Sequence, residues 1–342
     1  MTKRALITGG AGFIAHHLIG QILKTTDWDV VTLDRLDYSG NLNRLHDLML
    51  SFDPEVRKRV KVVHHDLKAE LNPLIRFEIG QVDYILHLAA GSHVDRSIEY
   101  PMEFVLDNVV GTCNILEFAR TQKDNLERFV YFSTDEVFGP APNGIKYQEN
   151  DRYNSTNPYS ASKAGGEELA VAYENTYGLP IYITHTMNVF GERQHPEKYI
   201  PMCIKKIRDG ETVTIHSDPT KTIPGSRHYI HAEDVASAVL FLVNYEGKFE
   251  PSWGGAKCPK FNIVGAEELN NLELAQIIAE AEGIELNYEL VDFHSSRPGH
   301  DLRYALDGDK MKQLGWTPSK SVRERIADVT KWTLKNERWI TV

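Results

Sequence analysis

A glycine-rich turn near the N-terminus restricts the fold more than any other feature of this sequence. The segment Thr8–Ala15, TGGAGFIA, follows the short apolar run Arg4–Thr8 and opens a stretch with helical spacing. Gly9, Gly12 and Ala15 form a GxxGxxA pattern, in which glycine permits a tight turn and the close approach of a pyrophosphate to a helix N-terminus. The pattern predicts a strand–turn–helix unit that binds a dinucleotide, and glycines of an ordinary turn are the alternative interpretation.

The first half of the chain repeats this alternation of strand and helix. Short apolar runs, as found in parallel sheets covered on both faces, occur at Arg4–Thr8, Val30–Asp34, Val60–His65, Tyr84–Ala90, Phe129–Thr134 and Ile181–Asn188. Helical patterns occur near residues 13–24, 71–79, 102–121 and 158–177. Repeated units of this kind predict an α/β fold, a doubly wound parallel sheet of the Rossmann type.

The second half is less regular. Helical spacing recurs near residues 232–244, 272–282 and 321–336, a strand is expected at 260–264, and 216–225 has the composition of a surface loop. We expect residues 1–180 to form the dinucleotide-binding domain, with a return of the chain near 228–245. Residues 181–342 should then form a smaller α/β lobe that binds the substrate.

Composition narrows the class of protein. The formal net charge of −10 comes without a basic block, which argues against nucleic-acid binding. No apolar stretch approaches the roughly 20 residues of a membrane span, and no secretory leader pattern is visible at the N-terminus. Cys113, Cys203 and Cys258 are odd in number and far apart, which fits a reducing compartment better than disulfides or a zinc site. We expect a cytoplasmic enzyme without a metal.

Polar or small residues end each of the first four apolar runs, where open α/β sheets bind their ligands. Asp34 ends the second run, where an acid binds the ribose hydroxyls of NAD and repels the 2′-phosphate of NADP. Arg35 follows directly and would weaken that preference, so NAD is favoured without excluding NADP. The expected cofactor contacts are Gly9, Gly12, Phe13, Ile14, Asp34, Arg35, Leu36, Asp66, Leu67, Leu88, Ala89, Ala90 and Ser92.

Groups that transfer protons cluster after the fifth run. Thr134-Asp135-Glu136 places two adjacent carboxylates at its end, and Tyr159 and Lys163 follow within YSASK. A tyrosine and a lysine at i and i+4 share one helix face, so the ammonium would favour the phenolate. Two carboxylates add a second acid/base pair if their environments separate their pKa values. A solvated turn is the alternative for the carboxylates alone.

These segments together resemble the extended short-chain dehydrogenase/reductase family, and within it the nucleotide-sugar 4,6-dehydratases. The resemblance covers nearly the whole chain. Its segments are TGGAGFI, HLAAGSHVDRSI at 87–98, STDEVFG at 133–139, YSASK, PEKYIP at 196–201 and RPGHDLRYAL at 297–306. The first two are shared with epimerases, decarboxylases and reductases of the family, whereas the Thr-Asp-Glu triplet and the RPGHDLRYA segment are more selective.

The resemblance implies a reaction order. Tyr159 would take the proton of the sugar 4-hydroxyl while hydride leaves C4 for NAD⁺, with Thr134 hydrogen-bonded to the C4 oxygen. Lys163 would lower the pKa of Tyr159 and hold the nicotinamide ribose, so both residues also contact the cofactor. Glu136 would remove the C5 proton and Asp135 would protonate the departing 6-hydroxyl. Hydride would return to C6, which leaves a 4-keto-6-deoxy sugar.

The resemblance also implies the substrate contacts, and the chain departs from the family at several of the neighbouring positions. The implied contacts to a nucleoside-diphosphate hexose, dTDP-glucose or a UDP-sugar, are Ser92, Thr134, Asn188, Lys198, Arg227, Asn262, Arg297 and His300. Gly91 stands where the family usually has Glu, Asp107 replaces a small hydroxyl residue, and Val189 replaces a second Asn. The Arg227-His228-Tyr229 segment and the longer loop before it differ as well, which leaves the base and the sugar open.

Two alternatives and one assembly prediction remain. An epimerase or decarboxylase has the same fold without the carboxylate pair, and a non-catalytic NAD-binding protein tends to lose the Tyr/Lys pair. In the family two helices per subunit form a four-helix homodimer contact, and we expect the same here. Its apolar positions would be Phe104, Val105, Val109, Leu116, Phe118, Leu169, Val171, Ala172 and Tyr173; packing of both helices on the sheet alone is the alternative.

Overall fold

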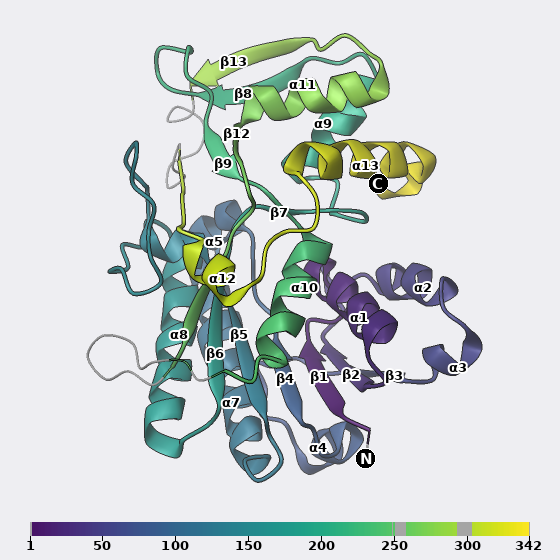
Figure 1. The fold of residues 1–342 in the computed structure, drawn as a ribbon, viewed down its shortest axis with the longest axis vertical. Coiled ribbons are helices and arrows are strands. Elements are labelled where there is room, and N and C mark those ends of the chain that lie inside the picture. Colours follow the sequence, from purple (N-terminus) through teal and green to yellow (C-terminus); the bar gives the residue numbers. More distant parts are fainter. Residues whose placement is uncertain (1, 248, 250–257, 293–302, 342) are drawn as a thin grey trace.

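A seven-stranded sheet forms the centre of the protein, for which the computed structural model describes residues 2–247, 249, 258–292 and 303–341 (Figure 1). Every pair of neighbouring strands is parallel. In spatial order the strands are β11 (Lys260–Ile263), β6 (Ile181–Thr186), β5 (Arg128–Thr134), β4 (Tyr84–His87), β1 (Arg4–Thr8), β2 (Asp29–Asp34) and β3 (Val60–His64). Because the order reverses between β1 and β4, a crevice opens at their carboxyl ends, where ligands bind in such sheets.

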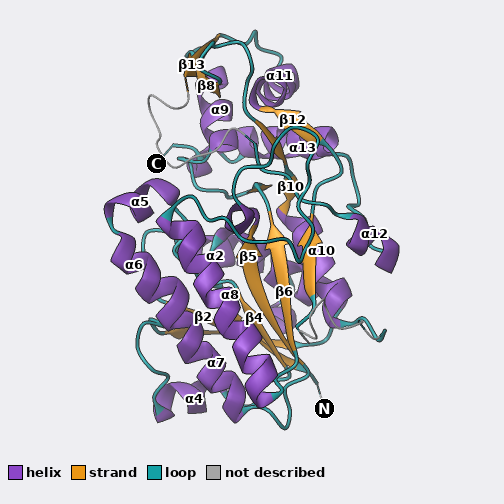
Figure 2. Cartoon of the chain, turned by 90° about the vertical axis from the view of Figure 1, so that its left-hand side faces the viewer, coloured by secondary structure: helices purple, strands orange, loops and turns teal. Residues whose placement is uncertain are grey.

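Helices cover both faces of the sheet, which confirms the predicted doubly wound architecture. One face carries α1 (Phe13–Thr25), α2 (Leu42–Leu50), α3 (Pro54–Arg57), α10 (Ala232–Val243) and α12 (Asp309–Leu314). The other carries α4 (Pro73–Ile79), α7 (Gly111–Thr121) and α8 (Pro158–Tyr177), preceded by α5 (Val94–Glu99) and α6 (Pro101–Val105). Figure 2 shows α4, α6, α7 and α8 over this second face.

The long helix α8 is fixed at both ends by its sequence. Asn157 and Ser160 form a capping box, Pro158 occupies the first turn, and Gly178 ends the helix with a left-handed φ of 67°. Each device satisfies or removes a backbone group that a helix end would leave unpaired. The side chains on the first two turns of α8 are therefore held in a fixed relation to the end of β5.

A smaller layer lies above the carboxyl ends of the strands (Figure 1). This layer has a core of its own. Its helices are α9 (Tyr199–Arg208), α11 (Asn271–Glu282), α13 (Val322–Lys335) and η4 (Glu337–Trp339). Its strands form three pairs, which are β8 (Val213–Ser217) with β13 (Tyr288–Asp292), β9 (Ser226–His228) with β12 (Glu268–Asn270), and β7 (Val189–Phe190) with β10 (Ile230–His231). The division near residue 180 stays a prediction, and strands β6 and β11 of the central sheet both follow that position.

Four sequence-based boundaries need correction. The single helix expected over 102–121 consists of α6, a π-helical turn (Leu106–Val110, η1) and α7. The runs expected to end at Ala90 and Asn188 end at His87 and Thr186, because the following residues turn into the crevice. The first two residues of the loop expected at 216–225, His216 and Ser217, belong to strand β8.

Candidate active site

A cavity of about 590 Å³ lies at the crevice between the sheet and the upper layer. Nearly all the residues expected at the site line it. From the cofactor set these are Gly9, Gly12, Phe13, Ile14, Asp34, Arg35, Asp66, Leu67, Leu88, Ala89, Ala90 and Ser92, and from the remainder Thr134, Asp135, Glu136, Tyr159, Lys163, Asn188, Lys198 and Arg227. Residues far apart in the sequence thus meet around one space.

Two expected residues do not line the cavity. Asn262 is fully buried, its amide nitrogen donates to the carbonyl oxygens of Tyr147 and Asp307, and its oxygen lies 3.1 Å from His185 Nδ1. All its polar groups are used within the fold, so it is a structural residue and the substrate contact predicted for it is wrong. Leu36 has a left-handed φ of 58° and packs its side chain against the core beneath α1. Arg297 and His300 lie outside the described residues.

The glycine-rich turn has the shape that a dinucleotide requires. Gly9 adopts a φ of +71°, and a Cβ there would lie 2.9 Å from the backbone of Ala89. Gly12 begins α1, and no side chain caps its first turn. The backbone N–H groups and the positive end of the helix dipole are thus directed at the cavity, which suits a pyrophosphate. The predicted strand–turn–helix unit has the geometry of a dinucleotide site.

Asp34 is oriented by the backbone around it. Its two oxygens accept hydrogen bonds from the N–H groups of Ala11 (2.9 Å) and Leu36 (2.8 Å), and its side chain is buried at the end of β2. This fixes a carboxylate edge on the cavity wall beside the glycine turn. The residues therefore fit a ribose diol at this point, as the position of Asp34 after the second strand predicts.

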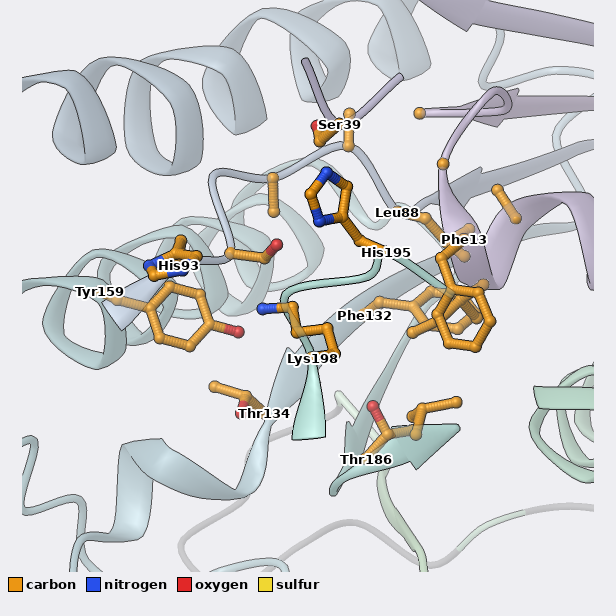
Figure 3. Close-up of a pocket in the computed structure, with 18 of the residues that line it drawn as sticks. Phe13, Ser39, Leu88, His93, Phe132, Thr134, Tyr159, Thr186, His195 and Lys198 are labelled. Atoms are coloured by element: carbon orange, nitrogen blue, oxygen red, sulfur yellow. The ribbon is translucent and has the colours of Figure 1, made fainter. Parts of the chain in front are cut away.

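The other end of the cavity brings the proton-transfer groups together. Thr134 ends β5, and Asp135 begins the short 3₁₀ turn η2 (Asp135–Phe138). The Thr134 hydroxyl donates to Asp135 Oδ1 at 3.1 Å, and Asn157 Nδ2 donates to Glu136 Oε2 at 3.1 Å. In Figure 3 the side chains of Thr134, Tyr159 and Lys198 point into one space, with Phe13, Leu88 and Phe132 on the opposite side.

Burial separates Asp135 from an ordinary aspartate. Asp135 is 5% exposed, and its Oδ2 has no hydrogen-bond partner among the residues that the structure describes. Burial, and then the neighbouring charge of Glu136, raise the pKa of Asp135 to about 7. A carboxyl group with this pKa is partly protonated near neutral pH, so Asp135 can act as an acid. The neighbouring Glu136 provides a second carboxyl group, which is oriented by its hydrogen bond from Asn157.

Burial shifts the pKa values of both members of the Tyr159–Lys163 pair. Burial, followed by the charges of Glu136 and Asp135, raises the pKa of Tyr159, and a hydrogen bond with Thr134 opposes the shift only partly. Burial also lowers the pKa of Lys163 to about 7, and its ammonium lies 4.3 Å from the ring centroid of Tyr131. The pKa of Tyr159 is therefore raised in the ligand-free protein, because burial and the two carboxylates dominate the shift, and the lowering by Lys163 stays a prediction.

Several cavity residues escaped the sequence analysis. Glu197 Oε1 lies 3.6 Å from His93 and 3.5 Å from His195, so two segments meet here on the cavity lining. Arg44 donates to the carbonyl oxygens of Ala11, Ser39 and Arg193 and ties the glycine turn to two other loops. Glu197 lies within the PEKYIP segment at 196–201, which was the only signal for it in the sequence. The three contacts of Arg44 exist only after folding.

Solved structures with the same fold define the class. The crystal structure of DesIV, a dTDP-glucose 4,6-dehydratase from Streptomyces venezuelae with NAD and TYD bound, matches with a TM-score of 0.84 at 35% identity and covers 99% of each chain. The dTDP-glucose 4,6-dehydratase from Bacillus anthracis in complex with NAD matches with a TM-score of 0.83 at 29% identity, over 99% of this chain and 98% of that one. The fold is that of the extended short-chain dehydrogenases/reductases.

The sequence narrows this class to one family. The family model for GDP-mannose 4,6 dehydratase matches residues 6–329. The chain therefore belongs to this family of nucleotide-sugar 4,6-dehydratases. It is 36% identical to a dTDP-glucose 4,6-dehydratase from Salmonella typhimurium over 98% of this chain and 94% of that protein. It is also 39% identical to the low-salt glycan biosynthesis protein Agl12 from Haloferax volcanii over 93% of this chain and 94% of that protein.

Proposed function

We propose that this protein is an NAD-dependent hydro-lyase that converts a nucleoside-diphosphate hexose to the 4-keto-6-deoxy sugar. The observation that carries the proposal is the meeting of Asp135 and Glu136 with Tyr159 and Lys163 in one cavity that also contains the glycine turn. An alcohol oxidation alone needs one proton acceptor, whereas elimination of water also needs a base for a C–H proton and an acid for the leaving hydroxyl. The relatives named dTDP-glucose 4,6-dehydratase, at about 35% identity over nearly the full chain, support this reaction.

The proposed roles follow from burial and hydrogen bonding. Bound NAD⁺ supplies reversible acceptance of hydride from the sugar, held by the turn at Gly9 and Gly12 and by Asp34. Tyr159 accepts the 4-hydroxyl proton, assisted by Thr134, with which it shares a hydrogen bond. Glu136, oriented by Asn157, removes the C5 proton. Asp135, whose pKa is raised to about 7 by burial, protonates the departing hydroxyl.

Cations from the upper layer are proposed to hold the diphosphate. Arg227 on β9 and Lys198 at the start of α9 both line the cavity. The Arg227 guanidinium lies 4.8 Å over the ring of Tyr304, which fixes its plane while its edge can pair with phosphate oxygens. Ser92 and Asn188 add neutral hydrogen-bonding groups on the lining. None of these residues discriminates between a thymine and a uracil base, so both dTDP-glucose and UDP-sugars stay open.

A substrate panel tests the function. The protein with NAD⁺ is incubated with dTDP-glucose, UDP-glucose, their N-acetyl relatives and GDP-mannose, the last because it gives the family its description. Loss of one water in the mass spectrum, with a keto product that absorbs in alkali, is the expected result for one of them. A product of unchanged mass but altered stereochemistry would favour an epimerase, loss of carbon dioxide from a uronic acid would favour a decarboxylase, and binding without turnover would favour a non-catalytic NAD-binding protein.

We further propose a homodimer in the cytoplasm. Met102, Val105 and Leu106 on and after α6 are 67%, 40% and 38% exposed, and they form an apolar strip on the outer helical face. Phe104, Leu116 and Phe118 are buried within the chain, so these three expected interface positions belong to the core instead. Size-exclusion chromatography with light scattering tests the assembly, and a monomer would contradict it.

The cytoplasmic location has a chemical argument behind it. The protein has three cysteines that form no disulfide, Cys113, Cys203 and Cys258, and the last two are buried. Free cysteines are typical of proteins in a reducing compartment. Within the described ranges, no helix combines the length and the apolar character needed to cross a membrane. No group of three or more metal-binding side chains occurs among those same residues.

A further inference from the structure

Arg35 is held by two carboxylates on the wall of the cavity. Its Nε donates to Asp37 Oδ2 at 2.7 Å, while Nη1 and Nη2 donate to the two oxygens of Asp107 at 2.5 and 2.9 Å. A bidentate arginine–carboxylate pair of this kind uses both the charge and the geometry of the guanidinium. The Asp107 side chain is only 10% exposed, so solvent screens the pair little.

Asp107 reaches this position because of the local backbone. It lies in the π-helical turn between α6 and α7, where the extra residue redirects the side chains. The next residue, Asn108, accepts from the Gly91 N–H at 2.8 Å and donates to the Gly91 carbonyl oxygen at 3.0 Å. A Cβ at Gly91 would lie 3.2 Å from Asp107 Oδ2. The absence of a side chain at Gly91 thus leaves the space that the Asp107 carboxylate occupies.

The second cation of this region is held in the same way. Lys68 Nζ lies 3.5 Å from Asp66 Oδ2 and 3.9 Å from Asp107 Oδ1. Arg35 and Lys68 therefore face the carboxylates of Asp37, Asp66 and Asp107, which line the cavity together with Asp34. Arg44 also lines this part of the wall, so three cations stand against four carboxylates and the formal charge there is negative. A phosphate group on the ribose beside Asp34 would find Arg35 and Lys68 already engaged by carboxylates, and Arg44 donating to three backbone carbonyl oxygens.

We propose that Asp107 is a specificity-determining residue, which makes the cavity select NAD over NADP by engaging Arg35 and Lys68. The inference rests on the proposed function, because it presupposes a nicotinamide dinucleotide in the cavity. It answers the ambiguity that Arg35 raises in the sequence. An arginine after Asp34 would bind a 2′-phosphate if its guanidinium were free to do so. In this protein the Asp107 carboxylate already occupies the guanidinium of Arg35.

Titration calorimetry of the ligand-free protein with NAD⁺ and with NADP⁺ tests the inference. The wild type should bind NAD⁺ more tightly. In Asp107→Asn the affinity for NADP⁺ should rise by roughly tenfold or more, because one negative charge near the phosphate is removed and Arg35 is partly released. The affinity for NAD⁺ should change by less than about threefold. Glu70→Gln, which removes an exposed acid paired with Arg76 outside the cavity, is the charge-matched control and should change neither affinity.

A second variant assigns the gain to the arginine. In Asp107→Asn/Arg35→Gln the improved binding of NADP⁺ should disappear. An unchanged NADP⁺/NAD⁺ ratio in Asp107→Asn, or a gain that persists without Arg35, would overturn the inference while leaving the proposed function intact. A wild type that binds neither dinucleotide would overturn both. If thermal unfolding shows that the Asn variant folds poorly, Asp107→Ser replaces it with the same expected result.

Discussion

The two ends of the cavity treat charge in opposite ways. At the adenosine end, Asp34 accepts two backbone hydrogen bonds and Arg35 is held by Asp37 and Asp107. At the catalytic end, Asp135 Oδ2 has no hydrogen-bond partner within the described part of the chain, and burial lowers the pKa of Lys163 to about 7. Charges at the first end are compensated within the fold, and charges at the second are desolvated.

This difference separates binding from catalysis. Compensated charges define a rigid wall, which suits the recognition of a cofactor. Desolvated groups have shifted pKa values, so they exchange protons near neutral pH at the expense of folding free energy. Substitutions at the catalytic end should therefore change the rate, and some should stabilise the fold. Substitutions at the cofactor end should change the affinity for the dinucleotide.

The largest effect is expected for Asp135→Asn. The amide has nearly the same shape but cannot donate a proton to the leaving hydroxyl, so loss of water should slow by about 10²–10⁴-fold. Mass spectrometry of the products measures the rate. Asp328→Asn, which removes a surface acid paired with Lys320, is the control and should keep full activity. Full dehydratase activity in Asp135→Asn would show that this carboxyl is not the acid.

Lys163→Met should lose activity yet gain stability. A buried ammonium without an ion-pair partner opposes folding, so the ligand-free variant should be more stable by about 1–3 kcal/mol at pH 6. Between about pH 7, the lowered pKa of Lys163, and its ordinary value of 10.5, the unfolded state binds the proton and the folded state does not. The stability contribution of Lys163 therefore rises with pH across this interval.

Chemical denaturation at several pH values measures this prediction. The wild type should approach the stability of Lys163→Met as the pH rises from 7 toward 10. Lys58→Met, which replaces an exposed lysine of a surface pair with Glu55, is the control and should follow the wild-type pH dependence. A variant that is less stable than the wild type at pH 6 would mean that the lysine is compensated after all.

The pH dependence of the rate should reveal Asp135 directly. Its acid form is required for elimination, and its pKa is raised to about 7 by burial and by Glu136, so kcat should fall about tenfold per unit above that pH. Because the folded pKa exceeds the unfolded one, the stability contribution of this group is present at low pH and is lost as the pH rises through about 7. The falling limb should be absent from the residual activity of Asp135→Asn. Its persistence there would assign the limb to another group.

The smallest effect is expected for Gly9→Ala at the cofactor end. Both Gly9 and Gly210 have a φ of +71°, but a Cβ contacts the backbone of Ala89 only at Gly9 and meets nothing within 4 Å at Gly210. Each substitution should cost roughly 1–2 kcal/mol of stability for the left-handed backbone. Only Gly9→Ala should also weaken NAD⁺ binding, as calorimetry would show. If the two variants weakened NAD⁺ binding equally, the close approach of Gly9 to Ala89 would not be the reason for the loss of affinity.

Local pattern predicted the sheet and most of the cavity. The strands β1 to β6 were recognisable because short apolar runs alternate with helical spacing, and strand ends automatically share one edge of a parallel sheet. Asn262 was misplaced because an asparagine after an apolar residue has the same local sequence whether it faces a ligand or a buried His185. The π-helical turn at Leu106–Val110 was missed because its apolar spacing differs from that of an α-helix by a single residue.

The sequence by itself determined the order of the strands along the chain, the glycine turn and the identity of the residues that carry protons. Only the tertiary structure decided which of those residues are compensated and which are desolvated. Gly91 and Asp107 are 16 positions apart in the sequence and become neighbours through the π-helical turn. Asp107 then contacts Arg35, which follows the end of strand β2. The pKa of Asp135 depends in the same way on what surrounds it, because burial and the placement of charges are properties of the packed chain and not of any segment within it.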